Sequence, residues 1–382
     1  MNSIQTLALR QRRLVLGAMV VLASCTLFGA AELGLRVRQE IRFGKFLRIE
    51  DTYALDPKSG MRIPVPGGTF GGIRINSMGF RGPELKMPKS SSTLRLAFLG
   101  SSTTYCAEVS NNENTWPHLV AQALQAEWPG LSVDYINAGV PGYSVLSSLK
   151  NLEYRVSPLE PDVIVIYEGH NDLTGNSFNL ARTQGLVSTP PAQNLSWPAK
   201  YSLLWYLVEK NLVIMSHERT ARQTAGKLSF DKEGLAGPFR RDLKDLVELS
   251  KRTAPIIVLV TFSTQLREDQ TPEQQSRAAA TSLYYMPYMS VNGLIQGYAE
   301  YNDVVRQVAL ETGAVLIAGE NAIPGDPQHF ADSVHFTDKG SHVMARRVAR
   351  GLIQSPRLQE LAANILSGKV SATSSALGRS HE

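Results

Sequence analysis

The stretch Asp162–Glu168, which reads DVIVIYE, decides the fold. Its central residues are apolar, mostly β-branched, and show no alternation of apolar and polar positions. A strand without such alternation is buried on both faces, and strands of this kind occur in parallel sheets that helices cover on both sides. The stretch therefore predicts a central strand of a parallel α/β sheet.

Similar apolar stretches lie before and after this strand, and helical patterns fill the intervals. We expect further strands at 94–100, 132–137, 255–261 and 314–318. We expect helices at 115–127, 144–156, 202–215, 241–253, 294–312 and 338–353. This alternation predicts a three-layer α/β/α architecture around a parallel five-stranded sheet.

Length and composition are typical of a globular chain. The 382 residues are 43% hydrophobic and 19% charged, which excludes a disordered chain, a collagen-like fibre and a coiled coil. We expect four segments: an N-terminal tail and transmembrane anchor at 1–45, an extended lead-in at 46–92, the α/β domain at 93–353 with an insertion at about 173–240, and a C-terminal helix with a disordered tail at 354–382.

Positive charge is concentrated at the N-terminus. Residues 1–48 carry eight positive and two negative side chains, a net +6, whereas the whole chain has a net charge of +5. The remaining 334 residues therefore sum to −1. Because the body carries no excess of basic residues, we expect no nucleic-acid partner.

The N-terminal segment contains an apolar run, Leu14–Ala31, of eighteen residues without a charge. That length is at the lower end of what a helix needs to cross ~30 Å of hydrocarbon. Three arginines precede the run, Arg10, Arg12 and Arg13, so we expect the short N-terminal tail to stay in the cytoplasm. The sequence therefore predicts a single-pass anchor with the body in the periplasm or outside the cell.

Two other fates of this segment stay open. Leu22-Ala23-Ser24-Cys25 resembles a bacterial lipobox, which would make Cys25 the lipid-bearing N-terminus of a lipoprotein. The small residues Gly29-Ala30-Ala31 would serve as the cleavage site of a secretory signal. The other cysteine, Cys106, is distant in the sequence, which excludes an intrachain disulfide framework.

Polar residues follow several predicted strands directly, at the edge where parallel α/β sheets bind their ligands. The segments are Gly100–Thr104, Asn137–Gly139, Gly169–Asp172 and Asp332–His335. Serine, histidine and a carboxylate are the groups that nucleophilic acyl transfer requires, because imidazole must take the serine proton and a carboxylate must orient the imidazole. An asparagine amide and a glycine N–H suit an oxyanion that develops opposite the serine.

These four segments, in this order, resemble the SGNH (GDSL-type) hydrolase family over about residues 93–352. Gly169-His170-Asn171-Asp172 matches its Gly-x-Asn-Asp block, and Asp332-Ser333-Val334-His335 matches its Asp-x-x-His block. Gly100-Ser101-Ser102 stands in place of Gly-Asp-Ser, so Ser101 replaces the acidic residue. The chain looks like a membrane-anchored bacterial member of this family.

The resemblance implies a flavodoxin-like SGNH fold and a serine esterase. Ser102 would be the nucleophile, His335 the general base and Asp332 the residue that orients it. The N–H groups of Ser102 and Gly139 and the amide of Asn171 would form the oxyanion hole. Neither a metal nor an organic cofactor is implied, and the expected partners are an ester substrate, such as acylated carbohydrate, and the membrane.

Several alternatives stay open at this point. The same site could pass an acetyl group to a polysaccharide hydroxyl, as an O-acetyltransferase, or the chain could be an inactive glycan-binding module. His329, Asp332 and His335 have a spacing that would also allow a metal site. The apolar helix around Trp205 and Tyr206 is interpreted as core or lid packing, with a lipid-binding helix as the alternative.

Overall fold

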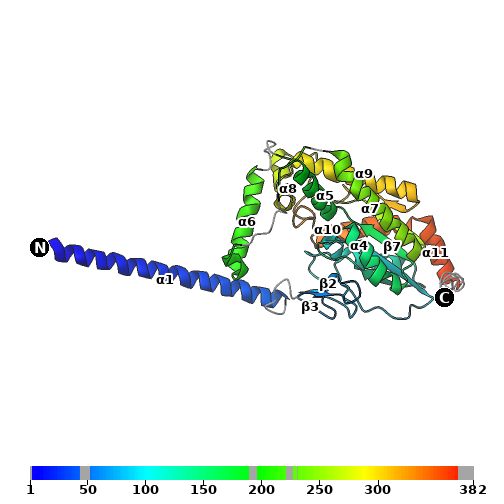
Figure 1. The fold of residues 1–382 in the computed structure, drawn as a ribbon. Helices are drawn as coiled ribbons and strands as arrows, with labels where there is room; N and C mark the ends of the chain where they lie inside the picture. The colour runs from blue at the N-terminus through cyan, green and yellow to red at the C-terminus, as the bar shows by residue number, and fades with distance from the viewer. Residues whose placement is uncertain (1, 44–51, 189–195, 221–226, 230, 369–382) are drawn as a thin grey trace.

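The computed structural model describes residues 2–43, 52–188, 196–220, 227–229 and 231–368 (Figure 1). Its main sheet has five parallel strands in the order β6-β5-β7-β8-β9. The strands are β5 (Thr93–Gly100), β6 (Ser132–Asn137), β7 (Val163–Tyr167), β8 (Ile256–Val260) and β9 (Val315–Ile317). The predicted parallel five-stranded sheet is thereby confirmed, with β7 at its centre.

Helices cover both faces of this sheet, which makes three layers (Figure 1). One layer holds α3 (Trp116–Glu127), α10 (Asp338–Ile353) and α11 (Pro356–Leu366). The other holds α4 (Val145–Asn151), α5 (His170–Thr183), α7 (Lys232–Thr253) and α9 (Val291–Thr312), while α8 (Pro272–Tyr285) packs on α9. Two short helical turns, η2 (Leu152–Val156) and η3 (Ser157–Leu159), follow α4.

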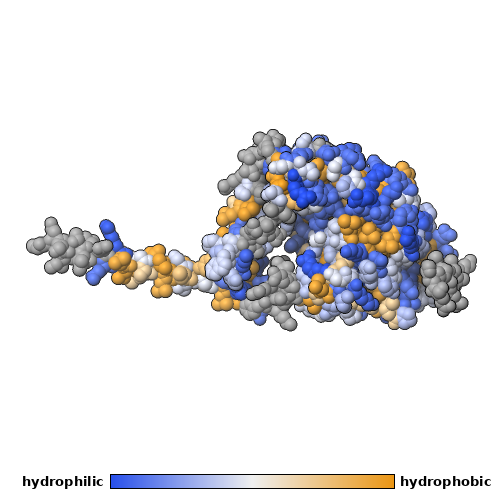
Figure 2. Space-filling view, in the orientation of Figure 1, coloured by the Kyte–Doolittle hydropathy of each residue, from blue (hydrophilic) through white to orange (hydrophobic). Residues whose placement is uncertain are grey.

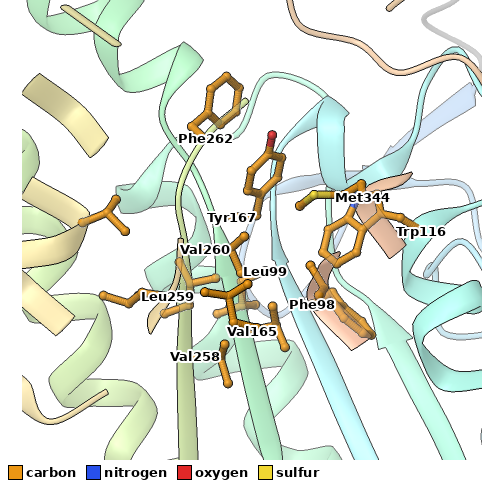
Figure 3. Close-up of a cluster of buried hydrophobic side chains, with 14 of the residues drawn as sticks. Phe98, Leu99, Trp116, Val165, Tyr167, Val258, Leu259, Val260, Phe262 and Met344 are labelled. Atoms are coloured by element: carbon orange, nitrogen blue, oxygen red, sulfur yellow. The ribbon is translucent and has the colours of Figure 1, made fainter. Parts of the chain in front are cut away.

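The core is built by side chains of the central strands, as Figure 3 shows. Every residue of β7 is buried, in agreement with its unbroken apolar sequence. On one side of the sheet the ring of Phe98 meets that of Trp116 edge to face, with 5.0 Å between the ring centres. Tyr167 stacks on Phe262 at 4.9 Å. Burial of each such side chain contributes roughly 1.5–3 kcal/mol to the hydrophobic stabilisation.

The lead-in before the sheet is folded onto the body. Its strands form two short antiparallel hairpins: β1 (Tyr53–Leu55) pairs with β2 (Arg62–Pro64), and β3 (Thr69–Phe70) pairs with β4 (Ile73–Arg74). Arg81 is 1% exposed and donates hydrogen bonds to the carbonyl oxygens of Tyr105, Cys106 and Val109. This lead-in therefore supports the loop that follows the first strand of the main sheet.

Two long helices lie outside the three layers (Figure 1). Helix α1 (Asn2–Phe43) includes a candidate membrane span, Gln11–Ile41, with a mean hydropathy of 2.2 in its most apolar window and none of that window buried. Helix α6 (Leu203–Thr220), with the short turn η4 (Pro198–Lys200) before it, contacts both α1 and α8. The tail expected to be disordered falls within 369–382, outside the described residues.

Some element boundaries differ from the expected ones. Helix α7 begins at Lys232 rather than at 241, because Asp231 caps its first turn and Pro238 is accommodated inside the helix. The regular α-helix expected at 144–156 ends at Asn151 and continues as a wider π-helical turn. The segment 173–240 contains most of α5, all of α6 and the start of α7.

Candidate active site

Ser102 is the first residue of the short helix α2 (Ser102–Tyr105), separated from the end of β5 by Ser101. Its Oγ is 2.8 Å from Nε2 of His335, which comes from the distant loop before α10. The neighbouring Ser101 is buried, and its hydroxyl lies 3.5 Å from that of Thr103. Of the two adjacent serines, Ser102 is therefore the one in contact with an imidazole.

His335 is held by Asp332 from the opposite side of the ring. Asp332 Oδ2 lies 2.8 Å from His335 Nδ1, and its Oδ1 accepts hydrogen bonds from the backbone N–H groups of Val334 and His335, both at 2.9 Å. A carboxylate only accepts hydrogen bonds, so Nδ1 carries the proton and Nε2 is free to accept from the Ser102 hydroxyl. The structure thus brings Ser102, His335 and Asp332 into one hydrogen-bonded chain.

The electrostatics of this pair favour its charged forms. Burial opposes ionisation of both groups, but the hydrogen bond and the opposite charge outweigh it. The interaction between the two side chains therefore lowers the pKa of Asp332 to about 2 and raises the pKa of His335 above its ordinary value. The nearby negative charge of Glu108 also raises the pKa of His335, whereas the positive charge of Lys210 on α6 lowers it.

Gly139 lies after β6 in close contact with α2. A Cβ at this position would lie 2.4 Å from the backbone nitrogen of Tyr105, so only glycine fits here without displacing the helix that begins with Ser102. Its N–H donates to Oδ1 of Asn137 at 3.2 Å, which is long for such a bond.

Asn171 lies in the first turn of α5, directly after β7. Its Nδ2 donates to the carbonyl oxygen of Tyr143 at 2.7 Å. An amide nitrogen carries two hydrogens, so this bond fixes the side chain and leaves one donor for a ligand. Ser102, as the first residue of its helix, has an N–H without an acceptor inside that helix.

Two buried carboxyl groups, Glu168 and Asp172, lie close to Asn171 in the sequence. Asp172 accepts a hydrogen bond from the backbone N–H of Val145 at 3.0 Å, and Glu168 accepts one from the Ser148 hydroxyl at 2.5 Å. Burial, with the charge of Asp242, raises the pKa of Asp172 to about 7. Burial and the charge of Asp172 raise the pKa of Glu168 well above its ordinary value.

Sequence reasoning missed several members of this neighbourhood. One of them is His170, whose ring stacks on Tyr298 and whose Nδ1 lies 2.7 Å from the tyrosine hydroxyl. Burial, together with the positive charge of His335, lowers the pKa of His170 to about 4. The charge of Glu168 at the end of an apolar strand was a usable signal, but nothing in the sequence connects Lys210 with the loop of His335.

A cavity of about 600 Å³ lies between the loop after β8 and α9. It is lined by Phe262, Arg267, Tyr298 and Asn302, among others, and none of Ser102, Asp332 and His335 lines it.

A metal site at His329, Asp332 and His335 was the alternative that their spacing allowed. Nδ1 of His329 lies 2.8 Å from Oδ1 of Asp326. Among the described residues, no three His, Cys, Asp or Glu side chains are grouped so that they could hold a metal ion.

Comparison with known proteins adds a family to this geometry. The model of the GDSL-like Lipase/Acylhydrolase family matches residues 98–343. A search of the curated proteins gives no match.

Among solved structures, the acetylxylan esterase Axe2 from Geobacillus stearothermophilus is similar, with 19% sequence identity and a TM-score of 0.39. The similarity covers 67% of this chain and 93% of Axe2. LAE5, an alpha/beta hydrolase enzyme from the metagenome of Lake Arreo, Spain, is similar with 17% identity and a TM-score of 0.40, over 68% of this chain and 96% of that one.

Proposed function

The chain belongs to the GDSL-like lipase/acylhydrolase family and is a hydrolase of ester bonds, and from this premise we propose that it works by a Ser102–His335–Asp332 mechanism. The observation that carries the proposal is the pair of 2.8 Å contacts that join the Ser102 hydroxyl through the imidazole to the carboxylate. A serine hydroxyl is a weak nucleophile until a positioned base takes its proton, and this arrangement supplies both the base and its orienting group.

The reaction runs in two acyl-transfer steps. Ser102 Oγ attacks the ester carbonyl carbon while its proton passes to His335 Nε2. The tetrahedral intermediate collapses, the imidazolium protonates the leaving alkoxide, and an acyl-serine remains. Water then attacks this acyl group with His335 again as general base, which releases the acid and regenerates the serine. Asp332 stabilises the imidazolium in both steps without taking a proton.

The oxyanion of each tetrahedral intermediate requires donors on the side of the carbonyl oxygen. We assign the N–H groups of Ser102 and Gly139 and the second Nδ2 hydrogen of Asn171 to this task. The support for Asn171 is its bond to Tyr143, which orients the amide before substrate arrives. Fixed donors of this kind stabilise the transition state more than the ground state, because they need no reorganisation as charge develops.

The proposed location is the outer side of a membrane, with α1 as an uncleaved anchor. The exposed apolar residues of α1 and the arginines before them support this orientation. O-acetyl groups of carbohydrate are the substrate class that we propose to test first, since acylated polysaccharides are esters found in this compartment. Cleavage after Ala31 or lipidation of Cys25 would replace the anchor, and mass spectrometry of the mature N-terminus decides between them.

The test is labelling with a fluorophosphonate, which reacts with activated serines whatever their natural substrate. We expect a membrane-impermeant probe to label the full-length protein in intact spheroplasts. Ser102→Ala should abolish labelling and lower ester turnover by roughly 10⁴-fold or more. Ser101→Ala, which removes the adjacent buried hydroxyl, is the matched control and should retain labelling.

Persistent labelling of Ser102→Ala would overturn the assignment of the nucleophile. Labelling only after lysis would overturn the orientation and leave the mechanism intact. Acetate release that requires a sugar acceptor would identify a transferase rather than a hydrolase.

A further inference from the structure

The outer face of α6 carries a continuous apolar stripe. Its members recur at spacings of four and three residues, which places them on one side of a helix. They are Trp205, Val208, Leu212 and Met215, with exposed fractions of 43, 47, 60 and 47%; Tyr201, which is 64% exposed, lies in the turn before the helix. Helix α6 also packs against α8, and the stripe is on the side that remains exposed. Figure 2 shows hydrophobic residues along α1 and on the outer side of the molecule at α6.

Helix α6 is fixed to α1 at its N-terminus. The carboxylate of Glu32 accepts hydrogen bonds from the backbone N–H groups of Leu203 and Leu204 and from the Ser202 hydroxyl, at 2.8–3.0 Å. Arg36 contacts Glu32 at 2.6 Å and donates to the Tyr201 carbonyl at 2.9 Å. Glu32 therefore satisfies backbone donors that a helix start leaves without partners, and it joins the two helices at a defined point.

This junction lies where the apolar run of α1 ends. Glu32 is the first charged residue after Leu14–Ala31, and at 1.5 Å per residue that run is about 27 Å long, close to the hydrocarbon thickness of a bilayer. With α1 across the membrane, as in the proposed function on which this step rests, the junction is at the membrane surface. Helix α6 runs across the direction of α1 in Figure 1, so it extends along that surface.

We propose that the outer face of α6 lies in the interfacial layer of the same lipid bilayer that α1 spans. The aromatic residues support this occupant: Trp197 and Tyr201 have ring centres 5.4 Å apart beside the junction, and Trp205 follows one turn later. Tryptophan and tyrosine are enriched at the level of the lipid head groups. Lys200, which is exposed in the turn before α6, adds positive charge next to the junction, which suits phosphate head groups.

A second copy of this chain is the competing occupant. A spacing of four and three residues is also that of a helix–helix seam, in which β-branched and leucine side chains dominate. This stripe begins instead with Trp205, and the exposed rings of Trp197 and Tyr201 precede it next to an apolar membrane helix, so that it continues the exposed apolar surface of α1. Continuity with the membrane segment therefore favours the bilayer.

The experiment uses the full-length protein in phosphatidylcholine vesicles whose acyl chains are brominated near the head group, because bromine quenches tryptophan on contact. The chain has four tryptophans, of which Trp116 is fully buried. We expect brominated lipid to reduce the emission, and the double substitution Trp197→Phe with Trp205→Phe to remove most of that quenching. Trp128→Phe, at the end of α3, is the control and should leave the quenched component unchanged.

A second comparison tests the stripe itself. Leu212→Glu places a charge on the stripe, and Asn211→Glu places the same charge on the adjacent exposed residue. Leu212→Glu should lower the quenching of Trp205 markedly, and Asn211→Glu should change it little. An unchanged thermal unfolding midpoint in both variants shows that the fold is intact, and unchanged fluorophosphonate labelling keeps this result separate from the mechanism.

Quenching that is the same with and without Trp197 and Trp205 would overturn the inference. A disulfide-linked dimer of Leu212→Cys in a Cys25→Ser background, without quenching by lipid, would assign the stripe to a second copy. Release of the whole protein from the vesicles by alkaline carbonate would show that α1 is not inserted, and the proposed anchor would fail together with the inference.

Discussion

In the proposed mechanism, Asn171 has two tasks for one amide group. Its bond to the Tyr143 carbonyl orients the side chain, and the remaining hydrogen is available at the edge of the sheet where Ser102 lies. Substitution of Asn171 is therefore expected to change both activity and stability, because loss of the amide also leaves the Tyr143 carbonyl oxygen without its donor. Kinetic constants and stability must therefore be measured together.

Asn171→Ala should lower kcat by roughly 10²–10³, about 3–4 kcal/mol, with KM changed little. Fluorophosphonate labelling should slow but persist, because Ser102 and His335 remain in contact. Steady-state kinetics on a soluble ester, with the thermal unfolding midpoint measured in parallel, check this expectation. A variant with normal kcat, or one that loses activity only by unfolding, would make Asn171 a structural residue.

The pH dependence of the reaction belongs to His335. In the proposed mechanism the neutral imidazole is the base, and its raised pKa shifts this form to higher pH, so kcat/KM should rise with pH through a midpoint above 6.5. Glu108→Gln should move this midpoint down and Lys210→Gln should move it up, since the two charges act on His335 with opposite sign. Initial rates from pH 5 to 9 measure both shifts, and equal shifts in one direction would contradict this account.

The contact between two of the candidate catalytic residues could be predicted because it is local in the sequence. Asp332 and His335 are three residues apart and contact each other within one loop. The partners that tune them could not be predicted in this way. Lys210 approaches from a helix more than one hundred residues earlier, and only the packing of α6 on α8 brings it near.

At the scale of elements, the end of β7 and the start of α5 place two ionisable carboxyl groups in the core, where burial favours their neutral forms. Glu168 and Asp172 are both buried, and an atom of each, Oε2 and Oδ2, has no hydrogen-bond partner within the described part of the chain. The hydrogen bond from Val145 ties α5 to the start of α4 through this pair. The contacts that hold the first turn of α5, which contains Asn171, therefore depend on the protonation state of two carboxyl groups.

Asp172→Asn should make stability less dependent on pH. The pKa of Asp172 is about 7 in the folded state and 3.8 ordinarily, so the unfolded state loses this proton first as pH rises. The contribution of Asp172 to the free energy of unfolding is therefore fully present below pH 3.8 and is lost as pH rises through 7. The neutral asparagine keeps an acceptor for Val145 and should gain roughly 2–4 kcal/mol relative to the parent at pH 8. Thermal unfolding midpoints at pH 5 and pH 8 test this, with Asp245→Asn on the exposed face of α7 as the control. A parallel change at both pH values would refute it.

Helix α8 was not expected from the sequence, because it lacks the apolar periodicity by which the other helices were predicted. The buried face of α8 consists mainly of small residues, such as Ser276, Ala279 and Ser282, so its apolar period is weak. Its start was nevertheless encoded, since Thr271 and Gln274 form a reciprocal capping box with Pro272 in the first turn. By contrast, the strands of the main sheet are apolar throughout and were found almost to the residue.

At the scale of the whole molecule, the α/β domain and the helices α1 and α6 followed from the sequence, whereas the folded lead-in and the exposed face of α6 did not. The two lead-in hairpins have strands of only two or three residues, too short for any alternation to be recognised. The helix around Trp205 was interpreted as core or lid packing, yet its apolar stripe is exposed. Both segments acquire their roles from tertiary contacts, with the loop after Ser102 in one case and with α1 in the other.

The buried guanidinium of Arg81 sets where the polypeptide can be shortened. The family match begins at residue 98, but three carbonyl oxygens just behind the nucleophile receive their hydrogen bonds from Arg81, upstream of that boundary. A fragment starting at residue 98 would lose these donors and also residues 93–97 of β5, which pair with β6 and β7 in the main sheet. The shortest fragment of this esterase that keeps these contacts therefore starts before the hairpins, near residue 52. Its N-terminal boundary is set by these contacts and not by the extent of sequence similarity.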